Sequence, residues 1–181
     1  MHSKIFQVCS HSIDPQEYTQ EMDYLDREDR RYADGYNYLN GRAYAVATCY
    51  GESKHRAVDD LKRQLMNSVK IEWVPDPFDE NEEKGVYEIT IFDKDRYFIP
   101  IYESFLSKLK SIGEYSFDAF SNERPHTAIK YDLMCLNSID SDEYGFYMND
   151  MNNGIKTLND FMRSANNGDR FYIGAVTDYC F

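Results

Sequence analysis

Hydrophobic periodicity constrains this chain most, because it switches repeatedly between the two-residue repeat of a strand and the 3.6-residue repeat of a helix. Residues 4–9 predict a first strand with Phe6 and Val8 on one face, and residues 42–50 also alternate. A helix over about residues 54–69 is indicated by a stripe made of Val58, Leu61, Leu65 and Val69. Strands and helices therefore share the first part of the chain.

The rest of the chain continues the mixture. Strands are predicted at residues 71–74, 127–137, 144–148 and 170–179. A hairpin is predicted from residues 86–92 and 96–99, turning at 93–95, and helices from Pro100 to Gly113 and over 154–166. Three helices and six or seven strands in mixed order predict an α+β fold, with a mixed or antiparallel sheet in a single domain of residues 1–181.

The net charge of −12 comes from 32 acidic against 20 basic residues, while 42% of the residues are hydrophobic and 15% are aromatic. Disordered acidic chains lack aromatic residues, so this composition predicts a folded protein. An acidic surface repels the phosphate backbone, which argues against general nucleic-acid binding, and it attracts basic surfaces. Two interpretations stay open: the charge serves solubility alone, or it selects a basic partner.

The four cysteines are far apart in the sequence, and each falls in a strand-like segment: Cys9, Cys49, Cys135 and Cys180. They form no CxxC pair and have no cysteine–histidine spacing typical of a metal site. We find no signal-peptide pattern and no apolar run long enough to span a bilayer. The sequence therefore predicts buried free thiols, a cytoplasmic location and no membrane contact.

Two cysteine–histidine pairs are candidates for nucleophilic catalysis. Cys49 lies six residues before His55, at the start of a predicted helix, and Cys9 is close to His11. A reactive thiolate needs a base or a positive helix end nearby. Four cysteines and four histidines give such pairs by chance, however, and a structural role for Cys49 is the favoured interpretation.

A group of carboxylates is the candidate for metal-dependent phosphodiester chemistry. Asp93 and Asp95 lie at the predicted hairpin turn, Glu88 lies on the preceding strand, and His126 begins another strand. Carboxylates at strand ends can hold Mg²⁺. Aspartate is also an ordinary turn residue, so turn chemistry is the preferred interpretation and no metal or cofactor is predicted. No HExxH, EF-hand, Walker A or GxSxG motif is present.

Acidic residues gather in two segments that also contain tyrosines. The first belongs to an expected surface insertion near residues 14–40, and the second follows the predicted strand 71–74. The residues predicted to contact a partner are Asp23, Tyr24, Asp26, Glu28, Asp29, Asp76, Asp79, Glu80, Glu82 and Glu83. Carboxylates spread over a surface can imitate the charge of a duplex, and tyrosines supply amphipathic anchors. A merely solvated face is the alternative.

Residues 23–29 and 76–83 carry a resemblance in character, without an alignable motif. In size, acidity, tyrosine content and lack of motifs, the chain resembles inhibitors that phages and other mobile elements make against host defence enzymes. These include antirestriction proteins and the anti-CRISPR proteins that block Cas9. The resemblance implies a non-enzymatic protein that binds a basic nucleic-acid-handling partner, such as a CRISPR or restriction nuclease. Because a few such inhibitors are enzymes, a metal-dependent nuclease stays as the alternative.

Overall fold

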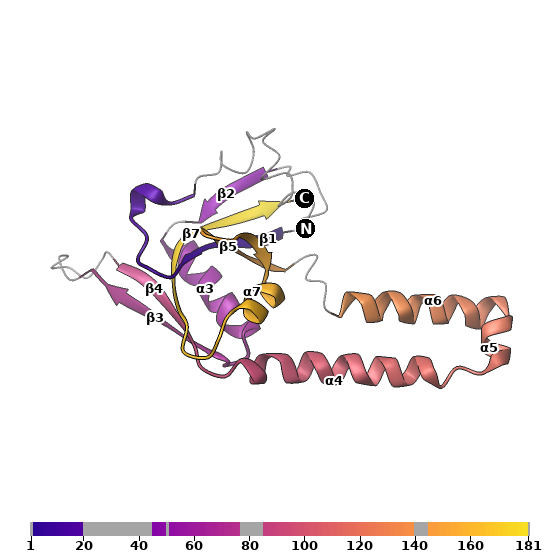
Figure 1. Cartoon of the computed structure of the whole chain (residues 1–181). Helices are drawn as coiled ribbons and strands as arrows, with labels where there is room; N and C mark the ends of the chain where they lie inside the picture. Colours follow the sequence, from indigo (N-terminus) through magenta and orange to yellow (C-terminus); the bar gives the residue numbers. More distant parts are fainter. Residues whose placement is uncertain (1, 20–44, 50, 77–84, 140–144, 181) are drawn as a thin grey trace.

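The structure of the protein is a computed structural model, which describes residues 2–19, 45–49, 51–76, 85–139 and 145–180 (Figure 1). Its strands are β1 (His2–Cys9), β2 (Ala45–Cys49), β3 (Val69–Pro75), β4 (Gly85–Ile91), β5 (Phe146–Asp150), β6 (Gly154–Thr157) and β7 (Arg170–Cys180). Its helices are the 3₁₀ turn η1 (Pro15–Glu17), α3 (Glu52–Gln64), α4 (Lys94–Gly113), α5 (Phe117–Ser121), α6 (Glu123–Ser138) and α7 (Leu158–Ser164).

The seven strands form one mixed sheet with β7 at its centre, because both edges of β7 are paired. One edge pairs with β1 in antiparallel orientation, with Phe6 opposite Val176. The other edge divides between β4, where Tyr87 faces Ile173, and β2, where Cys49 also faces Val176. β3 pairs with β4 and β6 with β5, while β5 runs parallel to β1.

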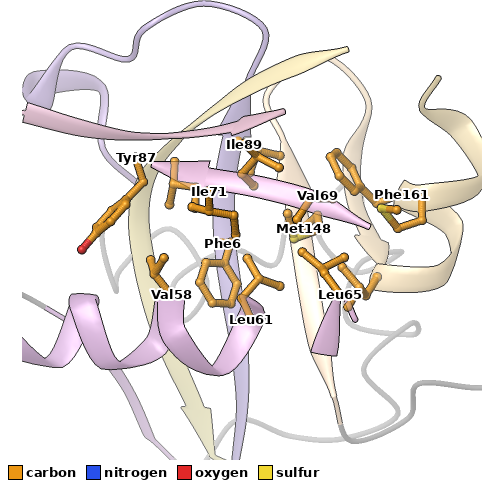
Figure 2. Packing of buried hydrophobic residues seen from close by; sticks show 14 of the residues in the cluster. Phe6, Val58, Leu61, Leu65, Val69, Ile71, Tyr87, Ile89, Met148 and Phe161 are labelled. Atoms are coloured by element: carbon orange, nitrogen blue, oxygen red, sulfur yellow. The ribbon is translucent and has the colours of Figure 1, made fainter. Parts of the chain in front are cut away.

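The core lies where α3 and α7 cover one face of this sheet (Figure 2). α3 directs Val58, Leu61 and Leu65 at the strands, and all three are fully or almost fully buried. Opposite them lie Phe6 of β1 and Ile89 of β4. The first three residues of the predicted stripe therefore pack as expected, since helical spacing of about 3.6 residues brings them to one side of the helix. The fourth, Val69, belongs to β3, because α3 ends at Gln64 and not near residue 69.

β1 is buried on its other face as well, which fixes the segment that follows it. The Gln7 side chain donates to the Glu17 carbonyl at 2.8 Å and accepts from the N–H of Thr19 and of Ala175. A Cβ on Gly174 would lie 2.7 Å from Gln7 Oε1, so glycine leaves the room that this amide needs. Residues 10–19 are therefore held against β1 and β7 by a buried polar side chain.

α4, α5 and α6 form an arm, residues 94–139, that projects from the sheet (Figure 1). α4 and α6 lie side by side, and α5 joins them at the end farthest from the sheet. The root of α4 is anchored by Asp93, which caps the N–H of Arg96, and by the buried Tyr97 hydroxyl, which donates to Asn159 of α7 at 2.6 Å. Lys94 adds hydrogen bonds to backbone carbonyls at the end of α7.

Three predicted elements are wrong. Residues 96–99 belong to α4 and not to a hairpin, because Asp93 starts the helix before Pro100. Residues 127–137 form most of α6 instead of a strand, so Cys135 and His126 lie on a helix. The helix predicted over 154–166 begins only at Leu158, because residues 154–157 pair with β5.

The fold class is α+β with a mixed sheet, as the sequence predicted, and the predicted strands at 4–9, 71–74, 86–92 and 170–179 are confirmed. Five α-helices, two more than predicted, occur in the described part of the chain. The start of the acidic insertion is the short turn η1, capped by Asp14, while residues 20–40 lie outside the described residues. None of the described helices is long and apolar enough to cross a membrane.

Candidate functional site

The residues predicted to contact a partner fall mostly outside the part of the chain that the structure describes. Residues 20–44 and 77–84 contain nine of the ten, and they are Asp23, Tyr24, Asp26, Glu28, Asp29, Asp79, Glu80, Glu82 and Glu83. Asp76, the tenth, directly follows β3 and lies at the rim of a cavity. The partner contact assigned to these ten residues therefore stays a prediction.

Charge is divided unevenly between the arm and the remainder of the chain. Residues 94–139 contain six basic and six acidic residues, so the arm carries no net charge. The whole net charge of −12 thus belongs to the residues outside the arm, which we call the acidic part. Residues 20–44, 77–84 and 140–144 alone contain thirteen acidic and five basic residues. Electrostatic attraction of a basic surface is consequently a property of the acidic part.

The arm is distinguished by exposed apolar side chains. Ten of the fifteen large apolar residues exposed among the described residues lie on it, and they are Ile99, Tyr102, Phe105, Leu106, Leu109, Phe117, Phe120, Tyr131, Leu133 and Met134. At 100° per residue, the apolar positions of α4 span an arc of about 200°. A single neighbouring helix covers about half of that arc, so α6 leaves the other half of the α4 apolar surface open.

An open cavity of about 850 Å³ lies at the root of the arm. We call it the base cavity. α4 lines it with Phe98, Ile101, Tyr102 and Phe105, α6 and the residue after it with Leu133, Leu136, Asn137 and Ile139, and α7 with Arg163. The guanidinium of Arg163 lies 5.5 Å from the centre of the Phe98 ring, a cation–π contact that gives this apolar hollow one basic wall.

The two long helices of the arm are joined by a polar contact in addition to apolar packing. Asp132 of α6 accepts hydrogen bonds from the Tyr115 hydroxyl at 2.7 Å and from Lys108 Nζ at 2.9 Å. These bonds, that from Tyr115 first, hold the pKa of the Asp132 carboxyl below its usual range. The same contact raises the pKa of Lys108. The register between α4 and α6 is therefore specified by a charged group as well as by shape.

A second cavity, of about 770 Å³, lies beside the first turn of α3. Lys54 lines it together with the aromatic residues Tyr18, Trp73 and Tyr172. The Lys54 ammonium lies 5.1 Å from the centre of the Tyr18 ring. Burial lowers the pKa of Lys54 to about 8, because an ammonium loses solvation in such a site.

The cysteine candidates have the wrong environment for a nucleophile. Burial, with a smaller contribution from Asp178, raises the pKa of the Cys49 thiol, whereas a reactive cysteine needs a lowered pKa. His55 contacts Tyr87 through its ring Nδ1 and packs edge-on against Trp73. Cys9 Sγ does lie 3.1 Å from His11 Nδ1, but only 1% of Cys9 is exposed. Cys9, Cys49 and Cys135 are free thiols, as predicted, but only Cys9 is buried, while Cys49 and Cys135 are half-buried.

The carboxylates proposed as metal ligands lie on different elements, and each makes its own contacts. Glu88 lies in the middle of β4, where the Tyr172 hydroxyl donates to it and Arg170 is near. Asp93 caps α4 and Asp95 belongs to its first turn. Within the described ranges there is no group of three histidine, cysteine, aspartate or glutamate residues that could hold a metal ion. The geometry therefore gives the nuclease hypothesis no support.

The arm surface is the feature that the sequence reasoning missed. Ile101, Phe105, Leu109 and Ile112 lie at helical spacing, and the neighbouring apolar positions Tyr102 and Leu106 widen this stripe beyond what one helix face buries. That excess was the available signal. Comparison with known proteins adds no further assignment: no protein-family model, no curated protein and no solved structure matches this chain.

Proposed function

We propose that this protein is a non-enzymatic inhibitor that binds a basic nucleic-acid-handling protein, such as a CRISPR or restriction nuclease, and blocks its nucleic-acid binding or activation. The uneven distribution of charge carries this proposal: a neutral arm is joined to an acidic part with a net charge of −12. Charge needed only for solubility has no reason to avoid one quarter of a chain, whereas charge that selects a partner belongs on the contacting surface.

The chemistry of the described residues agrees with a binding function. The thiols and carboxylates that were candidates for catalysis serve as strand, cap and packing residues. Carboxylates facing a basic nucleic-acid channel would speed association and prevent phosphate from occupying the same positions. We place the contact on the acidic segments 23–29 and 76–83, with Tyr24 as an amphipathic anchor.

The test measures inhibition of DNA cleavage by purified basic nucleases, including guide-loaded Cas9 and a restriction endonuclease, at several salt concentrations. In the acidic variant, Asp79, Glu80, Glu82 and Glu83 are replaced with Ala. The matched control replaces four exposed carboxylates of the arm with Ala, namely Asp95, Glu103, Glu114 and Asp118. Both variants have the same net charge.

We expect the acidic variant to need roughly tenfold more protein for the same inhibition at low salt, and the control to behave as the wild type. The wild-type inhibition should weaken as salt screens the charges. The proposal fails if the wild-type protein inhibits none of the basic nucleases, or if both variants lose inhibition equally, since the effect would then follow net charge and not its location.

A further inference from the structure

The arm carries a protruding apolar group and an open apolar hollow at opposite ends. Phe117 and Phe120 belong to α5, at the end farthest from the sheet, and they are 81% and 61% exposed (Figure 1). We call this pair the tip. The base cavity, of about 850 Å³, lies at the root between α4, α6 and α7. A folded protein rarely exposes side chains of this size at such fractions without a partner surface.

The tip cannot fill the cavity of its own chain. From Ile101, which lines the cavity, to Gly113 at the end of α4 there are twelve residues, or about 18 Å at 1.5 Å per residue. α4 is a continuous helix over this length and α6 runs back beside it, so the arm holds its two ends apart. Any chain that supplies a tip to the cavity must therefore come from outside.

We propose that the occupant is a second copy of this chain: two arms lie antiparallel, and the tip of each copy enters the base cavity of the other. A two-fold axis makes this exchange reciprocal, because a surface with a protrusion at one end and a hollow at the other is complementary to itself. The exposed face of α4 between the two ends is apolar throughout, with Tyr102, Phe105 and Leu109 at helical spacing.

Electrostatics favours the arm over the acidic part for contact between copies. Two molecules of charge −12 repel each other through their acidic parts. The arm has six charges of each sign, so two arms approach without that penalty, and an antiparallel arrangement also opposes their helix dipoles. The acidic parts then lie at opposite ends of the pair of arms, which keeps them apart.

The available area suits a stable homodimer. The residues considered are Tyr102, Phe105, Leu109, Phe117, Phe120 and Leu133. With about 200 Å² for an aromatic side chain and somewhat less for leucine, their exposed fractions amount to roughly 600 Å² on each copy. A standard interface buries about 800 Å² per partner, of which about 65%, or roughly 500 Å², is apolar in homodimers. The face is therefore large enough without recruiting any other surface.

The test measures the mass of the full-length protein in solution by light scattering and sedimentation over a range of concentrations. The wild type should have twice the monomer mass of 21.4 kDa. Phe117→Glu at the tip and Leu133→Lys in the base cavity should each raise the dissociation constant of the dimer about 100-fold, since a symmetric dimer loses each contact twice. Met151→Lys, which changes an exposed apolar residue outside the arm, should leave the mass unchanged.

The double variant Phe117→Glu/Leu133→Lys decides whether the tip and the cavity touch. If each tip enters the partner's cavity, the new glutamate meets the new lysine, and the double variant should dimerise more tightly than either single variant. These side chains are exposed, so the variants should keep the wild-type circular dichroism spectrum. A wild type that stays monomeric at roughly 100 μM, or single variants that dimerise like Met151→Lys, would overturn the proposal and assign the arm to a different protein.

Discussion

Lys54 should make the stability of this protein rise with pH between pH 7 and 9.5. Its half-buried side chain places the ammonium beside Tyr18 in the cavity next to α3, and this burial lowers the pKa of Lys54 from 10.5 to about 8. At 1.36 kcal/mol per pKa unit, the charged form is disfavoured by about 3 kcal/mol in the folded protein. Below pH 8 the lysine is protonated in both folded and unfolded chains, so the whole penalty is present. Above that pH the folded protein releases the proton first, and the penalty decreases.

Integration of this linkage gives an increase of about 2 kcal/mol in the free energy of unfolding between pH 7 and 9.5, with the remainder following towards pH 10.5. The assay is urea unfolding of the wild type and of Lys54→Met at half-unit steps of pH. The variant keeps the length of the side chain but removes the titrating group. Asp14, Asp76, Cys49 and Tyr172 line the same cavity and are present in both proteins.

The quantity to compare is the difference in unfolding free energy between the two proteins. Lys54→Met should be the more stable protein at pH 7 by up to about 3 kcal/mol, and its advantage should shrink as the pH rises. A difference that stays constant to about 0.5 kcal/mol over the range would mean that Lys54 titrates as a solvated lysine, and the reasoning from burial would be refuted.

Four further predictions concern packing and reactivity. Gly85→Ala should cost about 2 kcal/mol in urea unfolding because its Cβ would lie 2.5 Å from the Val74 carbonyl oxygen, whereas Gly113→Ala, with open space around it, should be neutral or stabilising. Leu61→Ala should cost about 2–5 kcal/mol by the same measurement, since Leu61 is fully buried under the sheet; a loss below 1 kcal/mol would contradict this core. Tyr97→Phe removes the hydroxyl that donates to Asn159 and should lower the free energy of unfolding by about 1 kcal/mol. Amide hydrogen exchange in the arm helices should become faster in this variant. Cys49 should react with iodoacetamide at pH 8 more slowly than a free thiol, because its pKa is raised; faster labelling would restore it as a candidate nucleophile.

The sequence predicted best the elements whose side chains pack in a simple way: strands inside the sheet, and a helix with one side on the core. β1 and β7 alternate or run apolar because they lie inside the sheet, and α3 has a single apolar stripe because only one of its sides meets the core. The α+β class followed from these elements. The branching of the sheet at β7 was not predictable, because the partners of a strand depend on contacts between distant residues that no local pattern encodes.

For the candidate site, the sequence predicted which residue types are present but not where they lie in the fold. The division of the −12 charge could have been read from the sequence, but its meaning depends on knowing that residues 94–139 form a separate arm. Neither the base cavity nor the burial of Lys54 has a local signature, since each is built from elements far apart in the chain. Asp76 is the one predicted contact residue that the described structure places, beside Lys54's cavity.

Two of the wrong predictions, those for α4 and α6, share a physical cause that bears on function. α6 was predicted as a strand because Ile129, Tyr131, Leu133 and Cys135 alternate, and α4 was cut short because Tyr97, Phe98 and Ile99 are consecutive. A helix that buries one side has one apolar stripe, and its period is plain. A helix that directs apolar residues both at its neighbour and away from it loses that period and imitates a strand. Ile129 is buried while Leu133, which lines the base cavity, is exposed, so part of the misleading alternation arises from the surface that we assign to the second copy. Local rules fail where a surface is kept for a partner, and here that failure identifies the arm.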